Sequence, residues 1–130
     1  MAGTEGSGGA LILIVEDNEK NMKLALDVLQ FHGFRTLEAT TAPEGLALAA
    51  EHHPDLILMD IQLPGMDGLT ALQRLRADPS TAAIKVIALT AFAMKDDRER
   101  FVSAGFDGYL SKPISVRELP QVIRQHLEQA

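Results

Sequence analysis

Four short apolar runs along the chain each end on an isolated polar residue or an acidic pair. The runs and the polar residues that follow them are 11–15 before Glu16 and Asp17, 56–59 before Asp60, 86–89 before Thr90, and 109–111 before Lys112. Uninterrupted apolar runs of this length are typical of strands buried on both faces of a parallel sheet. Because parallel strands end along one edge, where open α/β sheets bind ligands, we expect these polar residues to meet in one crevice.

Helical patterns alternate with these runs. Apolar periodicity and capping signals predict helices over about 19–31, 43–51, 68–77 and 96–104, a helix that begins at Ser115, and a further strand near 34–38. Pro120 would then fall about one turn into the last helix and remove a backbone hydrogen bond. A later start or a kink near Glu118 would avoid that loss. The pattern predicts an α/β fold in which five strands alternate with five helices through right-handed crossovers.

Composition limits the possible functions. The first ten residues are small and Gly-rich, so we expect a flexible tail over 1–10 and one domain over 11–130. The absence of cysteine excludes disulfides, thiolate metal sites and cysteine nucleophiles. No apolar run approaches the roughly 18 residues that span a bilayer, and no signal peptide is evident. A net charge of -6 disfavours nonspecific nucleic-acid binding. We therefore expect a cytoplasmic protein that binds neither membrane nor nucleic acid.

The acidic residues favour a cation at the predicted crevice. Glu16 and Asp17 stand where a nucleotide-binding fold would carry a Gly-rich loop, and their charge would repel a phosphate. Taken singly, Asp17 or Asn18 could equally cap the first helix, and Asp60 could be a turn residue. Like charges about 4 Å apart, however, repel by ~1 kcal/mol in water and by several times more when partly buried. An all-oxygen site of this kind suits Mg²⁺, or Mn²⁺, better than zinc.

The remaining strand-end residues add phosphoryl chemistry to this site. A carboxylate such as Asp60 can act as a nucleophile and form an acyl-phosphate. Lys112 could neutralise an incoming phosphoryl oxygen, and the Thr90 hydroxyl could donate to another. Outside such a site, the lysine would be a surface charge and the threonine a helix cap.

Four segments together resemble the receiver domain of two-component response regulators, over about residues 10–127. They are VEDNEKN (15–21), LMDIQLPGMDG (58–68), ALTAFA (88–93) and GYLSKP (108–113). The chain is most similar to single-domain regulators of the DivK type, and receivers appended to hybrid histidine kinases look similar. The resemblance implies a flavodoxin-like, doubly wound parallel sheet with strand order 2-1-3-4-5. It also implies a phosphorylation-activated signalling switch that works in a phosphorelay.

The same resemblance implies a role for each site residue. Asp60 would be the phosphoacceptor, and Mg²⁺ would be bound by Asp17, Asp60 and the backbone carbonyl of Gln62. Glu16, where many family members carry Asp, would act mainly through water. Thr90 and Lys112 would contact the bound phosphoryl group.

Further implied roles concern the switch and its lifetime. Tyr109 would enter the space that Thr90 leaves when the phosphoryl group draws it inward. The Lys112–Pro113 bond would be cis. Gln62 and Phe92 would flank the water that hydrolyses the acyl-phosphate, and the bulk of Phe92 predicts slow self-dephosphorylation. Phe92 could equally be an exposed aromatic residue that contacts a partner.

The resemblance implies partners rather than substrates. The phosphoryl donor would be a histidine kinase or a histidine phosphotransfer protein, and the phosphorylated receiver would act on a downstream protein. The chain would be a monomer or a weak dimer. It would not be an enzyme, apart from catalysing its own phosphoryl transfer and slow self-dephosphorylation. A receiver cut from a hybrid kinase stays possible. An aspartate-nucleophile phosphohydrolase also uses Mg²⁺, but it needs a second acid where this chain has Gln62, and it needs a cap insertion. The acidic first loop disfavours a flavin- or nucleotide-binding module.

Overall fold

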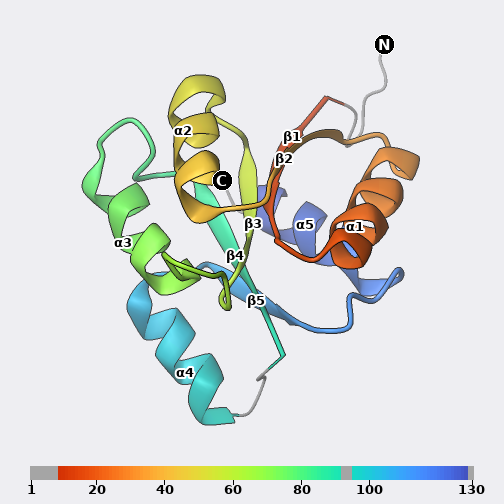
Figure 1. Ribbon diagram of the computed structural model, residues 1–130. Helices are drawn as coiled ribbons and strands as arrows, with labels where there is room; N and C mark the ends of the chain where they lie inside the picture. Colours follow the sequence, from red (N-terminus) through yellow and green to blue (C-terminus); the bar gives the residue numbers. More distant parts are fainter. Residues whose placement is uncertain (1–8, 92–94, 129–130) are drawn as a thin grey trace.

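In the part of the chain that the structure describes, five strands alternate with five helices (Figure 1). The computed structural model describes residues 9–91 and 95–128. The elements are β1 (Leu11–Val15), α1 (Glu19–Phe31), β2 (Arg35–Ala39), α2 (Ala42–His52), β3 (Leu56–Asp60), α3 (Gly68–Ala77), β4 (Lys85–Thr90), α4 (Lys95–Ala104), β5 (Gly108–Ser111) and α5 (Glu118–Glu128). Among the described residues, no helix has the length and apolar content that crossing a membrane requires.

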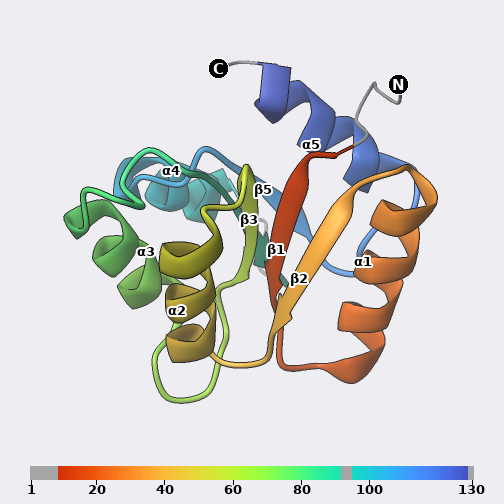
Figure 2. The same ribbon diagram turned by 90° about the horizontal axis from the view of Figure 1, so that it is seen from above.

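The strands form a single parallel sheet in the order β2-β1-β3-β4-β5, which confirms the predicted architecture. Figure 2 shows the helices in two layers: α1 and α5 cover one face of the sheet, and α2, α3 and α4 cover the other. All five strands therefore end along the same edge.

Each central strand contributes side chains to both layers because successive strand residues point to opposite faces. Leu13 and Val15 of β1 pack into the apolar layer beneath α2 and α3. Ile12 and Ile14 pack into the layer beneath α1 and α5. The three central strands are buried almost throughout, which explains why they read as unbroken apolar runs in the sequence.

Two local predictions need correction. The last helix begins at Glu118 rather than at Ser115. Pro120 consequently lies in the first turn, where a helix does not need its missing N–H. Ser115 still caps the helix, because its hydroxyl oxygen accepts from the Glu118 N–H at 3.1 Å. In α1 the apolar spacing predicts that Leu26 lies on the buried stripe, but Ala25 is buried instead and Leu26 is only partly buried.

Candidate functional site

The polar residues that follow the strands meet at the carboxyl edge of the sheet. Backbone hydrogen bonds continue past the paired strands and hold this edge in register. The Ile61 N–H donates to the Leu89 carbonyl at 3.0 Å, and the Lys112 N–H donates to the Thr90 carbonyl at 2.8 Å. Thr90 is fully buried at the end of β4. The sheet itself therefore fixes the spacing between the ends of β3, β4 and β5.

Lys112 is the cation at the centre of this edge. Its Nζ lies 2.7 Å from Oδ2 of Asp60 and 3.1 Å from Oε1 of Glu16. The side chain of Glu16 is 0 % exposed and that of Asp60 is 2 % exposed. Two buried carboxyl groups thus share one ammonium group.

Asp60 has a partner for each carboxylate oxygen. Oδ2 contacts Lys112, while Oδ1 accepts the backbone N–H of Gln62 at 2.9 Å. The carboxylate is therefore held in one orientation from two sides. Such preorganisation is what a nucleophile needs if it is to meet a reactant in a fixed geometry.

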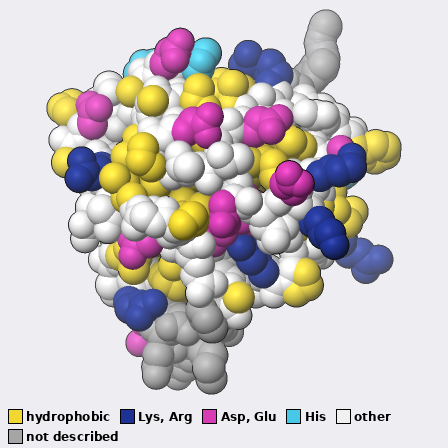
Figure 3. All heavy atoms as spheres, viewed as in Figure 1, with side chains coloured by type: hydrophobic (Ala, Val, Ile, Leu, Met, Phe, Trp, Pro, Cys, Tyr) yellow, Lys and Arg dark blue, Asp and Glu magenta, His cyan; other side chains and the backbone are white. Residues whose placement is uncertain are grey.

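A third carboxylate completes an acidic cluster. One oxygen each from Glu16, Asp17 and Asp60 lies within 4.8 Å of the other two. Asn18, rather than Asp17, caps α1: its side chain accepts from the Asn21 N–H at 3.0 Å. Asp17 is exposed at the mouth of the cluster. Acidic side chains also gather across the middle of the face shown in Figure 3.

This donor set fits a hard divalent cation. Within the described part of the chain, Oε1 of Glu16 is the one buried side-chain polar atom that makes no hydrogen bond. Lys112 approaches this oxygen at 3.1 Å, but only as an ion pair. An unsatisfied buried oxygen beside two further carboxylates provides the kind of ligands that Mg²⁺ takes in proteins.

The charges of the cluster perturb one another. Burial, followed by the hydrogen bond and charge of Asp60, raises the pKa of Glu16 to about 7, although Lys112 opposes the shift. Burial lowers the pKa of Lys112, but its contacts with Asp60 and Glu16 outweigh burial, and the net shift is upward. Lys112 therefore stays protonated and positively charged beside the two carboxyl groups.

The other predicted residues surround this cluster. Gln62 is exposed on the loop after β3, and the Lys112–Pro113 bond is cis. Tyr109 of β5 is half-buried and packs against the apolar layer beneath α2 and α3. Phe92 lies outside the described residues.

Sequence reasoning missed one residue at this site. Gly68, which it treats only as the start of a helix, packs directly against the backbone of Asp60. The sequence around a glycine at a helix start carries no signal for such a contact, because the two residues are eight positions apart and a loop separates them.

The family follows from the comparison with known proteins. The family model for the response regulator receiver domain matches residues 12–124. The chain belongs to the response regulator receiver domain family. Its fold and the resemblance stated from its motifs are thereby confirmed.

This receiver domain is also similar in sequence to individual response regulators. It is 50% identical over 119 residues to the polar-differentiation response regulator DivK of Brucella ovis, a match that covers 92% of this chain and 97% of DivK. DivK of Brucella anthropi is 49% identical over the same length and coverage.

Solved structures agree with this assignment. A CheY-like response regulator receiver domain protein from Methanospirillum hungatei superposes with a TM-score of 0.83 and 32% identity, covering 92% of this chain and 94% of that one. The receiver domain of a sensor histidine kinase from Pseudomonas aeruginosa gives a TM-score of 0.85 and 34% identity, covering 93% and 99%. That structure holds a magnesium ion coordinated in its active-site cleft.

Proposed function

We propose that this receiver domain accepts a phosphoryl group from a phosphohistidine partner onto Asp60, with Mg²⁺, and relays it as a conformational change to another protein. The observation that carries the proposal is the buried Asp60 carboxylate, held by Lys112 at 2.7 Å and the Gln62 N–H at 2.9 Å beside two further carboxylates. The receiver domain with bound magnesium from a histidine kinase supports the same role for this cluster.

The proposed step is an in-line displacement at phosphorus. One Asp60 carboxylate oxygen attacks the phosphorus atom, and a P–O bond forms as the P–N bond to the donor's imidazole breaks. The electron pair of the P–N bond stays on that nitrogen. The ring leaves as neutral imidazole because its other nitrogen already carries a proton. The product is an acyl-phosphate on Asp60.

The surrounding groups stabilise charge during this transfer. Lys112 stands at the carboxylate and turns its ammonium group from Asp60 to the incoming phosphoryl oxygens. Glu16, Asp17, Asp60 and the Gln62 carbonyl would hold Mg²⁺. The ion, when bound, offsets the negative charge of the phosphoryl group and the carboxylates.

The signal would leave the site through Thr90 and Tyr109. Thr90 is buried at the end of β4, and its strand pairs with the strand that carries Tyr109. A dianion on Asp60 would draw the Thr90 hydroxyl, and Tyr109 would move inward from its half-buried position. The surface formed by α4, β5 and α5 would then change, and this surface would contact the downstream protein.

Incubation with a small phosphodonor such as acetyl phosphate, with and without Mg²⁺, tests this function. We expect intact-protein mass spectrometry to show one added phosphoryl group only with the metal ion, and hydroxylamine to remove it as it does from acyl-phosphates. A phosphorylated histidine kinase or phosphotransfer protein should serve as a second donor. Labelling that resists hydroxylamine, or no labelling from any donor, would refute the proposal.

The lifetime of the product separates this function from a hydrolase. Gln62, two residues after Asp60, offers no carboxylic acid to protonate a leaving group or activate water. We therefore propose slow self-dephosphorylation and no turnover of small phosphate esters. Decay of the added mass within seconds, or steady release of phosphate from such an ester, would contradict this part of the proposal.

A further inference from the structure

The loop between β3 and α3 returns onto the backbone of the residue from which it departs. It leaves the sheet at Asp60 and ends at Gly68, the first residue of α3. The Gly68 N–H donates to the Ile61 carbonyl at 3.0 Å, which closes the loop at its base. Gly68 itself is buried. The start of α3 and the end of β3 are therefore in direct backbone contact.

Glycine is required at this contact for space. A Cβ atom at Gly68 would lie 2.5 Å from the Asp60 carbonyl oxygen and 2.9 Å from Cα of Ile61. Both are backbone atoms, which cannot rotate away as the end of a side chain can. Gly65 in the same loop differs: it has a φ of +79° and open space around it, so its need is conformational.

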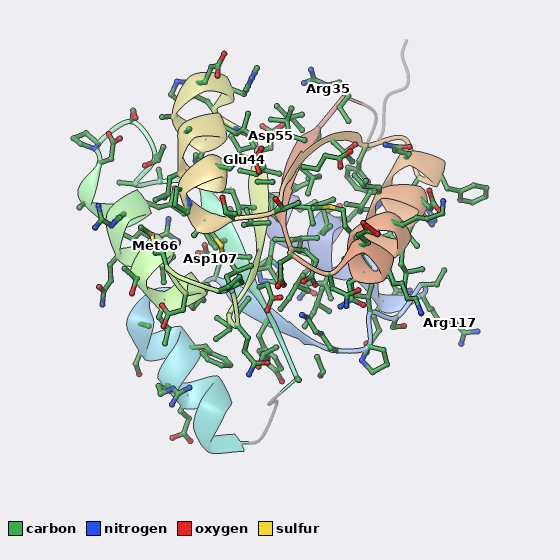
Figure 4. All side chains as sticks on the ribbon, in the orientation of Figure 1. Arg35, Glu44, Asp55, Met66, Asp107 and Arg117 are labelled. Atoms are coloured by element: carbon green, nitrogen blue, oxygen red, sulfur yellow. The ribbon has the colours of Figure 1, made fainter. Side chains whose placement is uncertain are left out.

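The same loop carries a group that holds the phosphoacceptor. The Gln62 N–H donates to Oδ1 of Asp60 at 2.9 Å. Ile61 and Leu63 are buried in the apolar layer beneath α2 and α3, and Met66 packs against that layer. Figure 4 shows Met66 beside α3. The loop is thus anchored by apolar side chains along its length and closed by Gly68 at its base.

We propose that Gly68 is a positioning residue for phosphoryl transfer to Asp60, an inference that rests on the proposed function. The absence of a side chain at Gly68 lets α3 abut the Asp60 backbone. The abutment fixes the Gln62 N–H and carbonyl relative to the Asp60 carboxylate. A methyl group there pushes either the end of β3 or the loop away, and the nucleophile loses its fixed orientation.

The test compares Gly68→Ala with Leu75→Ala, which removes a buried side chain from the same helix two turns further on. Both variants lose stability, but only the first touches Asp60. Labelling by acetyl phosphate at saturating Mg²⁺ is measured per folded molecule. We expect Gly68→Ala to slow labelling by about tenfold or more, as displacement of a reacting group does. Leu75→Ala should label at the wild-type rate.

A second readout follows the geometry without any transfer. The amide resonance of Gln62 reports its hydrogen bond to Asp60, so Gly68→Ala should shift it in the metal-free protein. Leu75→Ala should leave it in place. If Gly68→Ala does not fold, the substitution is repeated with His53→Gly. His53 ends α2 at a φ of +48°, where glycine is unstrained, so this change raises stability away from the site.

The outcomes separate this inference from the function on which it rests. A wild-type protein that takes no phosphoryl group from any donor overturns the proposed function. A wild-type protein that is labelled, together with a Gly68→Ala variant labelled at the wild-type rate and an unmoved Gln62 amide, overturns the role of Gly68 alone. Slowed labelling with a shifted amide supports it.

Discussion

Aspartates lie at both edges of the sheet, the amino edge where the strands begin and the carboxyl edge where they end, but their surroundings differ. At the amino edge, each aspartate accepts from a strand backbone. Oδ2 of Asp55 accepts the Leu11 N–H at 2.7 Å, and Oδ2 of Asp107 accepts the Val86 N–H at 2.8 Å. Arg76 adds an ion pair to Asp107 at 3.0 Å. Figure 4 shows Arg35 and Asp55 together at the amino edge. Asp55 and Asp107 thus each have a backbone N–H partner of their own.

At the carboxyl edge the carboxylates crowd together instead. Glu16, Asp17 and Asp60 approach one another closely, and Lys112 is shared by two of them. The difference follows from strand direction. A parallel strand begins with N–H groups that carboxylates can accept from, whereas it ends with carbonyl groups, so carboxylates there accept N–H groups only from the loops that follow, as Asp60 does from Gln62. The carboxylates crowd together there, and Oε1 of Glu16 remains without a hydrogen bond, so the carboxyl edge favours the binding of a cation.

The largest contrast is expected from matched substitutions of one aspartate at each edge. Asp60→Asn should abolish labelling by acetyl phosphate, because an amide is not a nucleophile of the required kind, while the circular dichroism spectrum stays that of a folded α/β protein. Asp55→Asn should be labelled as the wild type is. Full labelling of Asp60→Asn would show that Asp60 is not the phosphoacceptor.

A similar contrast holds for the two cations that contact these carboxylates. Lys112→Met should slow labelling by roughly 10²–10³-fold, as loss of one charge-stabilising group does in a preorganised site. Arg76→Met should leave the labelling rate of the folded protein unchanged, because Arg76 donates to the carbonyls of Ala82, Ile84 and Gly105 far from Asp60. Rates measured under identical Mg²⁺ compare the two. Equal slowing in both variants would show that Lys112 has no special role in the transfer to Asp60.

Sequence reasoning predicts the carboxyl edge well because its evidence is local. Each buried strand corresponds to one apolar run in the sequence, and the polar residue after the run marks the end of the strand. Strand direction then brings Glu16, Asp60, Thr90 and Lys112 together without any knowledge of tertiary contacts. The sequence also indicates the late start of α5, because a helix that began at Ser115 would conflict with Pro120.

The amino edge and Gly68 could not be predicted in the same way. Asp107 gains its role from Arg76 on α3 and Val86 on β4, which are distant in sequence and become neighbours only in the folded sheet. Gly68 likewise contacts Asp60 through a loop whose closure no periodicity encodes. Contacts between segments, rather than patterns within them, determine these positions.

Removing Asp107 should cost stability without affecting transfer. Asp107→Ala should lower the free energy of unfolding by about 1.5–3 kcal/mol, the range for hydrogen bonds to a charged group, because the Val86 N–H and Arg76 lose their acceptor. Asp107→Asn keeps an oxygen for the Val86 N–H and should lose less. Urea unfolding gives both values, and labelling per folded molecule should match the wild type. A labelling defect would show that the two edges are coupled.

The smallest expected effect is the response of stability to Mg²⁺, which should depend on the carboxyl edge alone. A ligand that binds only the folded state stabilises it, and free Mg²⁺ at ten times its dissociation constant should add about 1.4 kcal/mol to the free energy of unfolding. Asp17→Asn removes one exposed carboxylate of the cluster, so its gain at the same Mg²⁺ concentration should be smaller. Asp55→Asn should keep the full gain, because its carboxylate contacts Leu11 at the other edge of the sheet. Thermal unfolding with and without Mg²⁺ measures all three. An equal gain in the three proteins would place the cation away from the acidic cluster and remove the chemical distinction between the two edges.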